Sequence, residues 1–203
     1  IFPIIKKFLY SDHEIFLREL VSNAVDATTK LKTLGRLGEF TGEIGKTTID
    51  IKVDEKKGTL HIIDRGVGMS KAEVEKYLNQ VAFSGASEFL KEYEGKVEED
   101  GIIGHFGLGF YSAFMVSKKV EVHTKTWRDE DAVKWVCDGS PEFSVTKAKK
   151  TDRGTEIILH IDGESKEFLE ESWISQILNK YCKFLPVEIK FGTKTEYIDS
   201  PPG

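Results

Sequence analysis

The chain has 203 residues, of which 39% are hydrophobic and 31% are charged, and its formal net charge at pH 7 is −5. This length and composition fit one soluble globular domain with a hydrophobic core. The acidic balance argues against a nucleic-acid partner, which favours a basic surface, and no apolar run approaches the roughly 20 residues that cross a bilayer. The two cysteines, Cys137 and Cys182, lie far apart without metal-ligand spacing, which favours a reducing compartment.

The first predicted helix begins near Ser11 or Asp12, either of which can cap it, and ends before Gly35 and Gly38. Its apolar residues recur at the three- and four-residue spacings of a helix that packs on a core. They are Leu17, Leu20, Val21, Ala24, Leu31 and Leu34. We therefore expect this helix to bury one face against the rest of the domain.

A polar stripe follows a second face of the same helix. Residues four and seven apart lie nearly one above another on a helix, which places Glu19, Asn23 and Asp26 together. Two carboxylates and an amide at the edge of a core need partners, because burying each of them unpaired costs about 1–3 kcal/mol. The stripe alone fits a solvated face and a binding site equally well.

The middle of the chain is expected to contain a hairpin and a second helix. Two alternating stretches predict the strands of the hairpin, 48–53 and 60–63, joined by a turn at Lys57 and Gly58. Ser70 followed by Glu73 is a capping-box pattern, and it opens a helix that is expected to run to about Gln80. The glycine-containing stretch 84–109 has no clear periodicity, and such long connections are usually functional or disordered.

Beyond residue 109 the pattern changes to short alternating stretches separated by polar turns, which predicts an antiparallel meander. The stretches are Val120 with Val122, Val133 to Cys137, Phe143 with Val145, and Ile157 to Ile161. An amphipathic helix over 168–181 and a last strand over 187–191 complete the chain. Helices and strands that do not alternate regularly predict an α+β two-layer sandwich. We expect residues 1–192 to form one domain of a longer protein and residues 193–203, which end in Pro-Pro-Gly, to begin a linker.

A glycine motif lies between the predicted hairpin and the second helix: Asp64-Arg65-Gly66-Val67-Gly68-Met69. Glycines allow the backbone to approach a ligand closely, and an aspartate at a strand end can accept a hydrogen bond from an exocyclic amine. The same pattern is also common in ordinary turns.

A second glycine motif leads into a helix of small residues at 111–114: Gly104-His105-Phe106-Gly107-Leu108-Gly109-Phe110. The free N–H groups and the positive dipole end of a helix N-terminus suit a polyphosphate. The spacing superficially resembles a dinucleotide fingerprint, but that motif follows a strand in a βαβ unit. No Walker-type loop is present, so a nucleotide needs a different kind of site.

The helix stripe and the two glycine motifs, in this order, resemble the GHKL ATPase superfamily of DNA gyrases, ninety-kilodalton heat-shock chaperones, histidine kinases and mismatch-repair ATPases. The wording of 14–24 and 104–114 is most similar to the nucleotide-binding domain of the ninety-kilodalton heat-shock proteins. The resemblance extends from about Leu9 to Phe191. It implies the GHKL (Bergerat) fold, a mixed but mostly antiparallel sheet that helices cover on one face.

The resemblance also implies roles for single residues. Glu19 would be the general base that orients the attacking water, Arg18 would support it, and Asn23 would be the ligand to Mg²⁺ on the phosphates. Asp64 would hold the adenine amine of ATP or ADP. The remaining nucleotide contacts would be Asp26, Ala27, Gly68, Met69, Tyr77, Phe83, Ser84, Gly85, Gly104, His105, Phe106, Gly107, Leu108, Gly109, Phe110 and Thr155.

Three of these positions depart from the usual family pattern. Phe83 stands where relatives commonly have a lysine near the phosphates, Tyr77 stands at a usually polar position, and His105 replaces a glutamine. Because the aromatic ring at Phe83 carries no charge, the resemblance implies weaker neutralisation of the phosphates. The segment 84–109 would be a lid over the nucleotide.

At the level of the whole protein, the resemblance implies a chaperone in which ATP closes the lid and dimerises two such domains, coupling hydrolysis to the folding of client proteins. Hydrolysis by this part alone is expected to be slow, because relatives supply a catalytic arginine from the following domain. Ansamycin or resorcylic-lactone inhibitors are expected to bind the same pocket. The wording favours a bacterial, cytoplasmic member and leaves an organelle form open.

Three other functions stay open at this point. A histidine-kinase domain shares the asparagine helix and glycine motifs but does not ordinarily use a glutamate in the role of Glu19. A topoisomerase or mismatch-repair ATPase does use one, but the acidic chain argues against it. A non-catalytic interaction domain whose glycines are only turns is the third alternative, and a nucleotide-binding assay separates it from the others.

Overall fold

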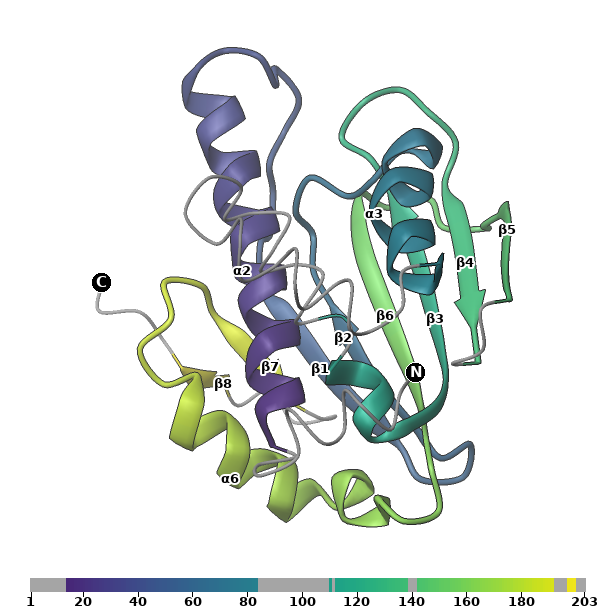
Figure 1. Ribbon diagram of the computed structural model, residues 1–203. Coiled ribbons are helices and arrows are strands. Elements are labelled where there is room, and N and C mark those ends of the chain that lie inside the picture. Colours follow the sequence, from purple (N-terminus) through teal and green to yellow (C-terminus); the bar gives the residue numbers. More distant parts are fainter. Residues whose placement is uncertain (1–13, 84–109, 111, 139–141, 192–196, 200–203) are drawn as a thin grey trace, which may run out of the picture.

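The computed structural model describes residues 14–83, 110, 112–138, 142–191 and 197–199. In this part of the chain the helices α2 (Ile15–Arg36), α3 (Lys71–Phe83) and α6 (Glu171–Tyr181) lie on one face of a single sheet of eight strands (Figure 1). Two short 3₁₀ helices, η1 (Ala113–Met115) and η2 (Lys166–Leu169), adjoin them. The predicted α+β two-layer architecture is confirmed.

The strands are β1 (Ile49–Asp54), β2 (Thr59–Ile63), β3 (Ser117–Lys125), β4 (Val133–Cys137), β5 (Phe143–Lys147), β6 (Gly154–Ile161), β7 (Ile189–Phe191) and β8 (Tyr197–Asp199). Their order in the sheet is β5-β4-β3-β6-β2-β1-β7-β8. The β1–β7 pair is parallel and the other neighbouring strands are antiparallel. The sheet is therefore mixed and mostly antiparallel, as predicted.

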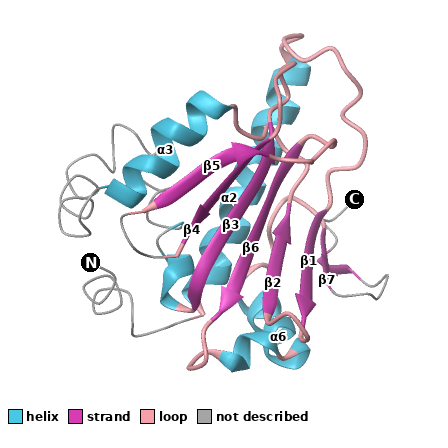
Figure 2. Cartoon of the chain, turned by 90° about the vertical axis from the view of Figure 1, so that its right-hand side faces the viewer, coloured by secondary structure: helices cyan, strands magenta, loops and turns pink. Residues whose placement is uncertain are grey.

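The predicted meander is only half correct. Strands β3, β4 and β5 follow one another as expected, but β6 pairs with β3 and β2 instead of β5 (Figure 2). The reason is burial: β6 places Ile157, Leu159 and Ile161 in the core, whereas β5 is half-buried or exposed along its length. An apolar strand gains more from a central place in the sheet than from a place beside a polar edge strand.

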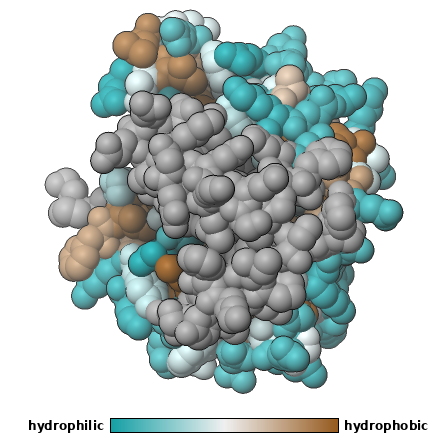
Figure 3. Space-filling model, in the orientation of Figure 1, coloured by the Kyte–Doolittle hydropathy of each residue, from teal (hydrophilic) through white to brown (hydrophobic). Residues whose placement is uncertain are grey.

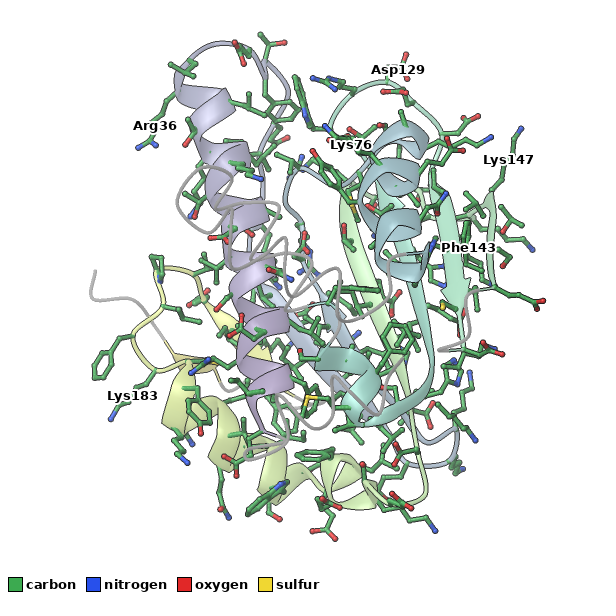
Figure 4. All side chains as sticks on the ribbon, in the orientation of Figure 1. Arg36, Lys76, Asp129, Phe143, Lys147 and Lys183 are labelled. Carbon is green, nitrogen blue, oxygen red and sulfur yellow. The ribbon has the colours of Figure 1, made fainter. Side chains whose placement is uncertain are left out.

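Helix α2 begins at Ile15, with Glu14 in the N-cap position, so the start predicted near Ser11 or Asp12 is too early. Its C-terminal end also differs from the prediction, because Gly35 is still helical and Gly38 has the positive φ of 76° that ends the helix. Arg36 in the last turn donates from Nη2 to Thr33 Oγ1 over 3.1 Å and points away from the sheet (Figure 4). A cation there favours the helix dipole.

The buried face of α2 agrees with the predicted apolar stripe. Leu17, Leu20, Val21, Ala24 and Leu31 are buried, whereas Leu34 is only half-buried near the end of the helix. This face packs against the 3₁₀ helices, α6 and the sheet, where one contact is an edge-to-face pair of Phe16 and Phe168 with ring centroids 5.0 Å apart. The helix is therefore fixed on the core, and its polar stripe has one possible orientation relative to the sheet.

The capping box that the sequence predicts opens α3. The Ser70 N–H donates to Glu73 Oε1 over 3.0 Å, and the Glu73 N–H donates to Ser70 Oγ over 3.2 Å. The helix continues to Phe83, beyond its predicted end at Gln80.

The single helix predicted over 168–181 is two elements, η2 and α6, because Glu170 between them is extended, with φ −87° and ψ 123°. The break allows both Phe168 and Ile174 to reach the core. The last predicted strand begins later than expected, at Ile189. The stretch predicted to begin a linker contains β8, which pairs antiparallel with β7.

The second face of the sheet is polar. Glu156 Oε2 pairs with His61 Nδ1 over 2.9 Å, and Glu121 pairs with His160 Nε2 over 2.5 Å and with His123 Nε2 over 3.2 Å. Partial burial raises the pKa of Glu121, but hydrogen bonds from the two histidines outweigh it and lower the pKa to about 2. His61, His123 and His160 thus lie on the face of the sheet opposite the helices.

On the helical side, the described surface is largely hydrophilic (Figure 3). Among the described residues, only two large apolar side chains are strongly exposed, Leu37 and Phe184. No helix in this part of the chain combines the length and the apolar character needed to cross a membrane.

Candidate functional site

A cavity of about 130 Å³ lies between α2, α3 and the inner face of the sheet. It brings together residues that are far apart in the sequence. Of the predicted site residues, it is lined by Asn23, Asp26, Ala27, Asp64, Gly68, Met69, Tyr77, Phe110 and Thr155. Apolar side chains from α2, β2, β3 and β6 complete its walls, among them Leu20, Ile62, Val122 and Ile157.

Asp64 is the only carboxylate among the buried residues that line this cavity in the described part of the chain, and it follows the last residue of β2. Its Oδ1 accepts a hydrogen bond from the Gly66 N–H over 2.9 Å. Burial raises the pKa of Asp64 to about 6, although backbone hydrogen bonds from Gly66 and Thr155 and the charges of Lys150 and Arg65 oppose the rise. The cavity therefore holds a buried acceptor that loses its proton close to neutral pH.

The loop 64–69 is fixed from both sides by backbone hydrogen bonds. The Val67 N–H donates to the Ala27 carbonyl over 3.2 Å, and the Trp127 N–H donates to the Val67 carbonyl over 2.8 Å. A Cβ on Gly66 would lie 2.4 Å from the Ala27 carbonyl carbon. The sequence suggests that these glycines admit a ligand, but the structure shows that they also admit the backbones of α2 and of the segment after β3.

Gly68 gives a direct test of this packing. It has φ 63°, and a Cβ there would lie 1.9 Å from the Lys125 carbonyl oxygen. We expect Gly68→Ala to lower the free energy of unfolding by about 3 kcal/mol or more, because strain and a backbone clash add together. Gly58→Ala is the matched control, since Gly58 has φ 67° but nothing within 4 Å of its Cβ position, and it should cost about 1 kcal/mol. Urea unfolding measures both, and equal losses would contradict the predicted clash.

Two threonines form the wall next to Asp64. Thr124 on β3 faces Thr155 on β6 in register, and their Oγ1 atoms are 2.8 Å apart. The Thr124 Oγ1 also accepts a hydrogen bond from the Met69 N–H over 2.9 Å. The sequence does not single out Thr124, because an isolated threonine in a strand carries no local signal of a site.

The polar stripe of α2 is divided between the cavity and its surroundings. Asn23 and Asp26 line the cavity, and so does Lys30, which the sequence analysis missed although it lies four positions after Asp26. The Nδ2 atom of Asn23 is buried and has no hydrogen-bond partner among the described residues. A buried donor without a partner is uncommon in folded proteins, and an acceptor on a bound group would satisfy it.

Glu19 and Arg18 do not line the cavity. Glu19 lies one helical turn before Asn23, and its Oε1 accepts a hydrogen bond from Arg18 Nη2 over 2.9 Å. The Arg18 guanidinium also lies 5.7 Å from the centre of the Tyr181 ring. Arg18 and Glu19 therefore form an ion pair at the end of the stripe.

The other predicted site residues lie outside the described part of the structure, in whole or by their side chains. Phe83 is the last residue of α3 and its side chain is not described. Ser84, Gly85 and the second glycine motif up to Gly109 lie outside the described residues. Within the described ranges, no group of three or more His, Cys, Asp or Glu side chains is arranged to hold a metal ion.

Comparisons with known proteins agree with this geometry. The sequence profile of a family described as histidine kinase-, DNA gyrase B-, and HSP90-like ATPase matches residues 10–157. The chain is 63% identical over 200 residues to the chaperone protein HtpG of Bacteroides thetaiotaomicron, covering 98% of this chain and 29% of that protein. It is 62% identical over 200 residues to the chaperone protein HtpG of Porphyromonas gingivalis strain W83, with the same coverage. With the chaperone protein HtpG of Shewanella sp. strain MR-4 it shares 42% identity over 201 residues, covering 96% of this chain and 31% of the relative. The chain thus spans less than a third of the length of these relatives.

Proposed function

The chain belongs to the family of histidine kinase-, DNA gyrase B- and HSP90-like ATPases, and on this basis we propose that it is the nucleotide-binding domain of an HtpG-type chaperone that binds and hydrolyses ATP. The observation that carries the proposal is the buried Asp64 carboxylate at the wall of a mostly apolar cavity. An apolar slot with one fixed acceptor suits a planar heterocycle that bears an amine. The high identity to HtpG chaperones favours this function over a histidine kinase or a topoisomerase.

The adenine ring is proposed to enter between α2 and the sheet. Its 6-amino group donates to the Asp64 carboxylate, whose position the Gly66 N–H already fixes. Ile62, Val122 and Ile157 supply apolar contacts for the ring, and Met69 contributes a soft, adaptable side chain at the edge of the cavity. The apolar contacts for the ring thus come from three strands, and Asp64 directly follows one of them, β2.

The phosphates are proposed to extend from this pocket along the polar stripe of α2. Mg²⁺ supplies charge neutralisation for the phosphates when bound, and the Asn23 amide oxygen would hold it, a fit with the preference of Mg²⁺ for few protein oxygens. Glu19, one turn further, is proposed to accept the proton of the attacking water as general base. Its ion pair with Arg18 fixes the carboxylate at that end of the stripe.

In the longer protein, we place residues 1–192 in the nucleotide-binding domain and residues 193–203 at the start of the connection to the rest. Lid closure over the nucleotide, pairing of two such domains and action on client proteins in the bacterial cytoplasm complete the proposal. The names of the HtpG relatives support the chaperone role. Ansamycin and resorcylic-lactone inhibitors are proposed to compete with nucleotide for the cavity at Asp64.

Calorimetric titration of ADP with Mg²⁺ into this protein tests the proposal. We expect saturable binding of one ADP per chain, and an ansamycin added beforehand should prevent it. A chain that is folded by circular dichroism but gives no heat with ADP, and no protection against thermal unfolding, would overturn the proposed function.

The pH dependence of binding follows from Asp64. Its pKa is raised to about 6 in the folded protein, so the carboxylate accepts the adenine amine fully at pH 7.5 and becomes protonated as the pH falls through 6. We expect adenosine to bind about tenfold more weakly at pH 5 than at pH 7.5, since about nine-tenths of the sites then carry a proton. Adenosine is the better probe because its phosphate-free structure does not titrate in this range. An affinity that does not change between these pH values would contradict the role of Asp64.

A further inference from the structure

Thr124 is a buried hydroxyl that the proposed function leaves unused. It is 0% exposed and does not line the cavity in the described part of the chain, but it contacts two residues that do. Its Oγ1 accepts the Met69 N–H over 2.9 Å and lies 2.8 Å from the Thr155 Oγ1. Thr124 therefore connects the loop after β2 to the wall beside Asp64.

The direction of the hydrogen bond between the two threonines follows from proton counting. A hydroxyl has one proton, and a buried proton needs an acceptor. If Thr155 donated to Thr124, the Thr124 proton would need a further acceptor in the core, and no other hydrogen bond of Thr124 among the described residues supplies one. If Thr124 donates to Thr155, the Thr124 oxygen accepts from Met69, the Thr124 proton is used, and the proton left over is that of Thr155, which lines the cavity. The second arrangement is favoured because the proton without a protein acceptor then lies at the cavity wall, on Thr155, and not on the fully buried Thr124.

The direction of the hydrogen bond from Thr124 to Thr155 decides which proton faces the cavity. Because the Thr155 oxygen accepts from Thr124, its own proton is free to be donated to a ligand. The wall then presents a donor at Thr155 beside an acceptor at Asp64, since the two residues are joined by a hydrogen bond from the Asp64 N–H to the Thr155 carbonyl over 2.9 Å. A 6-aminopurine has the complementary pair, an amine donor next to a ring-nitrogen acceptor. A 6-oxopurine has the reverse pair, an oxygen acceptor next to an N–H donor. Its oxygen would face the Asp64 carboxylate and its N–H would face the Thr155 donor, so neither contact is a hydrogen bond.

We propose that Thr124 is a positioning residue that fixes the Thr155 hydroxyl as a donor, and that it thereby selects 6-aminopurine nucleotides over 6-oxopurine nucleotides. The inference rests on the proposed function, because it requires that a purine lies against Asp64 and Thr155. Without the Thr124 hydroxyl, the Thr155 hydroxyl can rotate and accept the N–H of a 6-oxopurine. The preference for 6-aminopurines is then smaller, although the Asp64 carboxylate still repels the oxygen of a 6-oxopurine.

The experiment compares ADP and inosine diphosphate (IDP), each with Mg²⁺, by calorimetry on the wild type and on Thr124→Val. We expect the wild type to prefer ADP and Thr124→Val to reduce the ratio of the two affinities by about threefold to tenfold, the effect of one neutral hydrogen bond. Thr124→Ser keeps the hydroxyl and should keep the wild-type ratio. If Thr124→Val does not fold, Thr124→Ala takes its place, because it also removes the hydroxyl and adds no volume.

Thr28→Val is the matched control. Thr28 is also 0% exposed, and its hydroxyl donates to the Ala24 carbonyl within α2 over 2.9 Å. It should lose stability as Thr124→Val does but keep the wild-type ratio, which separates a structural effect from a change in selection. An unchanged ratio in a folded Thr124→Val that binds ADP overturns the inference and leaves the proposed function intact. A wild type that binds ADP and IDP equally also overturns the inference and leaves the proposed function intact. A wild type that binds neither nucleotide overturns the inference and the proposed function together.

Discussion

Asp64→Asn should abolish detectable ADP binding and at the same time stabilise the protein at pH 7. Binding is lost because the asparagine oxygen still accepts the backbone N–H of Gly66, which turns its NH₂ group, a donor, toward the amine of adenine. Two donors that face each other in a buried site cost more than the lost hydrogen bond alone. Calorimetry with ADP and Mg²⁺ measures the loss.

The stabilisation follows from the sign of the pKa shift of Asp64. Its pKa rises from 3.8 to about 6 on folding, so the folded state disfavours the charged carboxylate by about 3 kcal/mol at pH 7. This destabilisation is fully present above pH 6 and is absent below about pH 4, where both states are protonated. The variant should therefore melt roughly 5 °C or more above the wild type at pH 7 and show almost no difference at pH 4.

Asp54→Asn is the matched control for this prediction. Asp54 lies at the exposed hairpin turn, where its Oδ1 accepts the Lys57 N–H over 3.1 Å, and an asparagine oxygen can accept the same bond. We expect neither ADP affinity nor melting temperature to change. If Asp64→Asn keeps the ADP affinity of the wild type, the adenine amine does not lie at Asp64.

Glu19→Gln should remove hydrolysis and leave nucleotide binding almost unchanged. Glu19 lies outside the cavity lining, so its charge is not needed to hold the base, but an amide cannot take a proton from water. General-base catalysis contributes about 10²–10⁴-fold, and we expect the rate of phosphate release from γ-labelled ATP to fall by at least about 100-fold. ADP affinity should stay within about threefold, because the contacts at Asp64 are intact.

Glu14→Gln controls for the loss of a carboxylate near the start of α2. Glu14 contacts Lys180 and Tyr181 and does not line the cavity within the described residues, so its replacement should leave the hydrolysis rate unchanged. Hydrolysis by Glu19→Gln at the wild-type rate would exclude Glu19 as the base. A fall in ADP affinity equal to the fall in rate would instead show that Glu19 acts in binding.

Local signals in the sequence were sufficient for several features. The capping box of Ser70 and Glu73 formed as predicted, since it depends on residues three apart. The hairpin of β1 and β2 formed around Gly58 for the same reason. The buried face of α2 and the placement of Asp64 after a strand were also correct, because periodicity and a strand end are visible in a short window.

Other features depended on residues distant in sequence. The place of β6 between β3 and β2 is set by which strand buries the most apolar surface, a comparison across the whole chain. The break at Glu170 arises because Phe168 and Ile174 must both reach one core, which no helical period of the isolated segment shows. The local helix pattern therefore predicted one element where packing produced two.

The sequence by itself determined most of the elements, the place of Asp64 after a strand and the family resemblance, which the family match confirmed. Only the tertiary structure decided which of the predicted residues share a cavity, that Glu19 lies beyond it, and that Thr124 supports Thr155 from the next strand. The physical reason is that secondary structure follows from neighbours along the chain, whereas the Oγ1 contact of Thr124 and Thr155 and the raised pKa of Asp64 arise from groups that folding alone brings together.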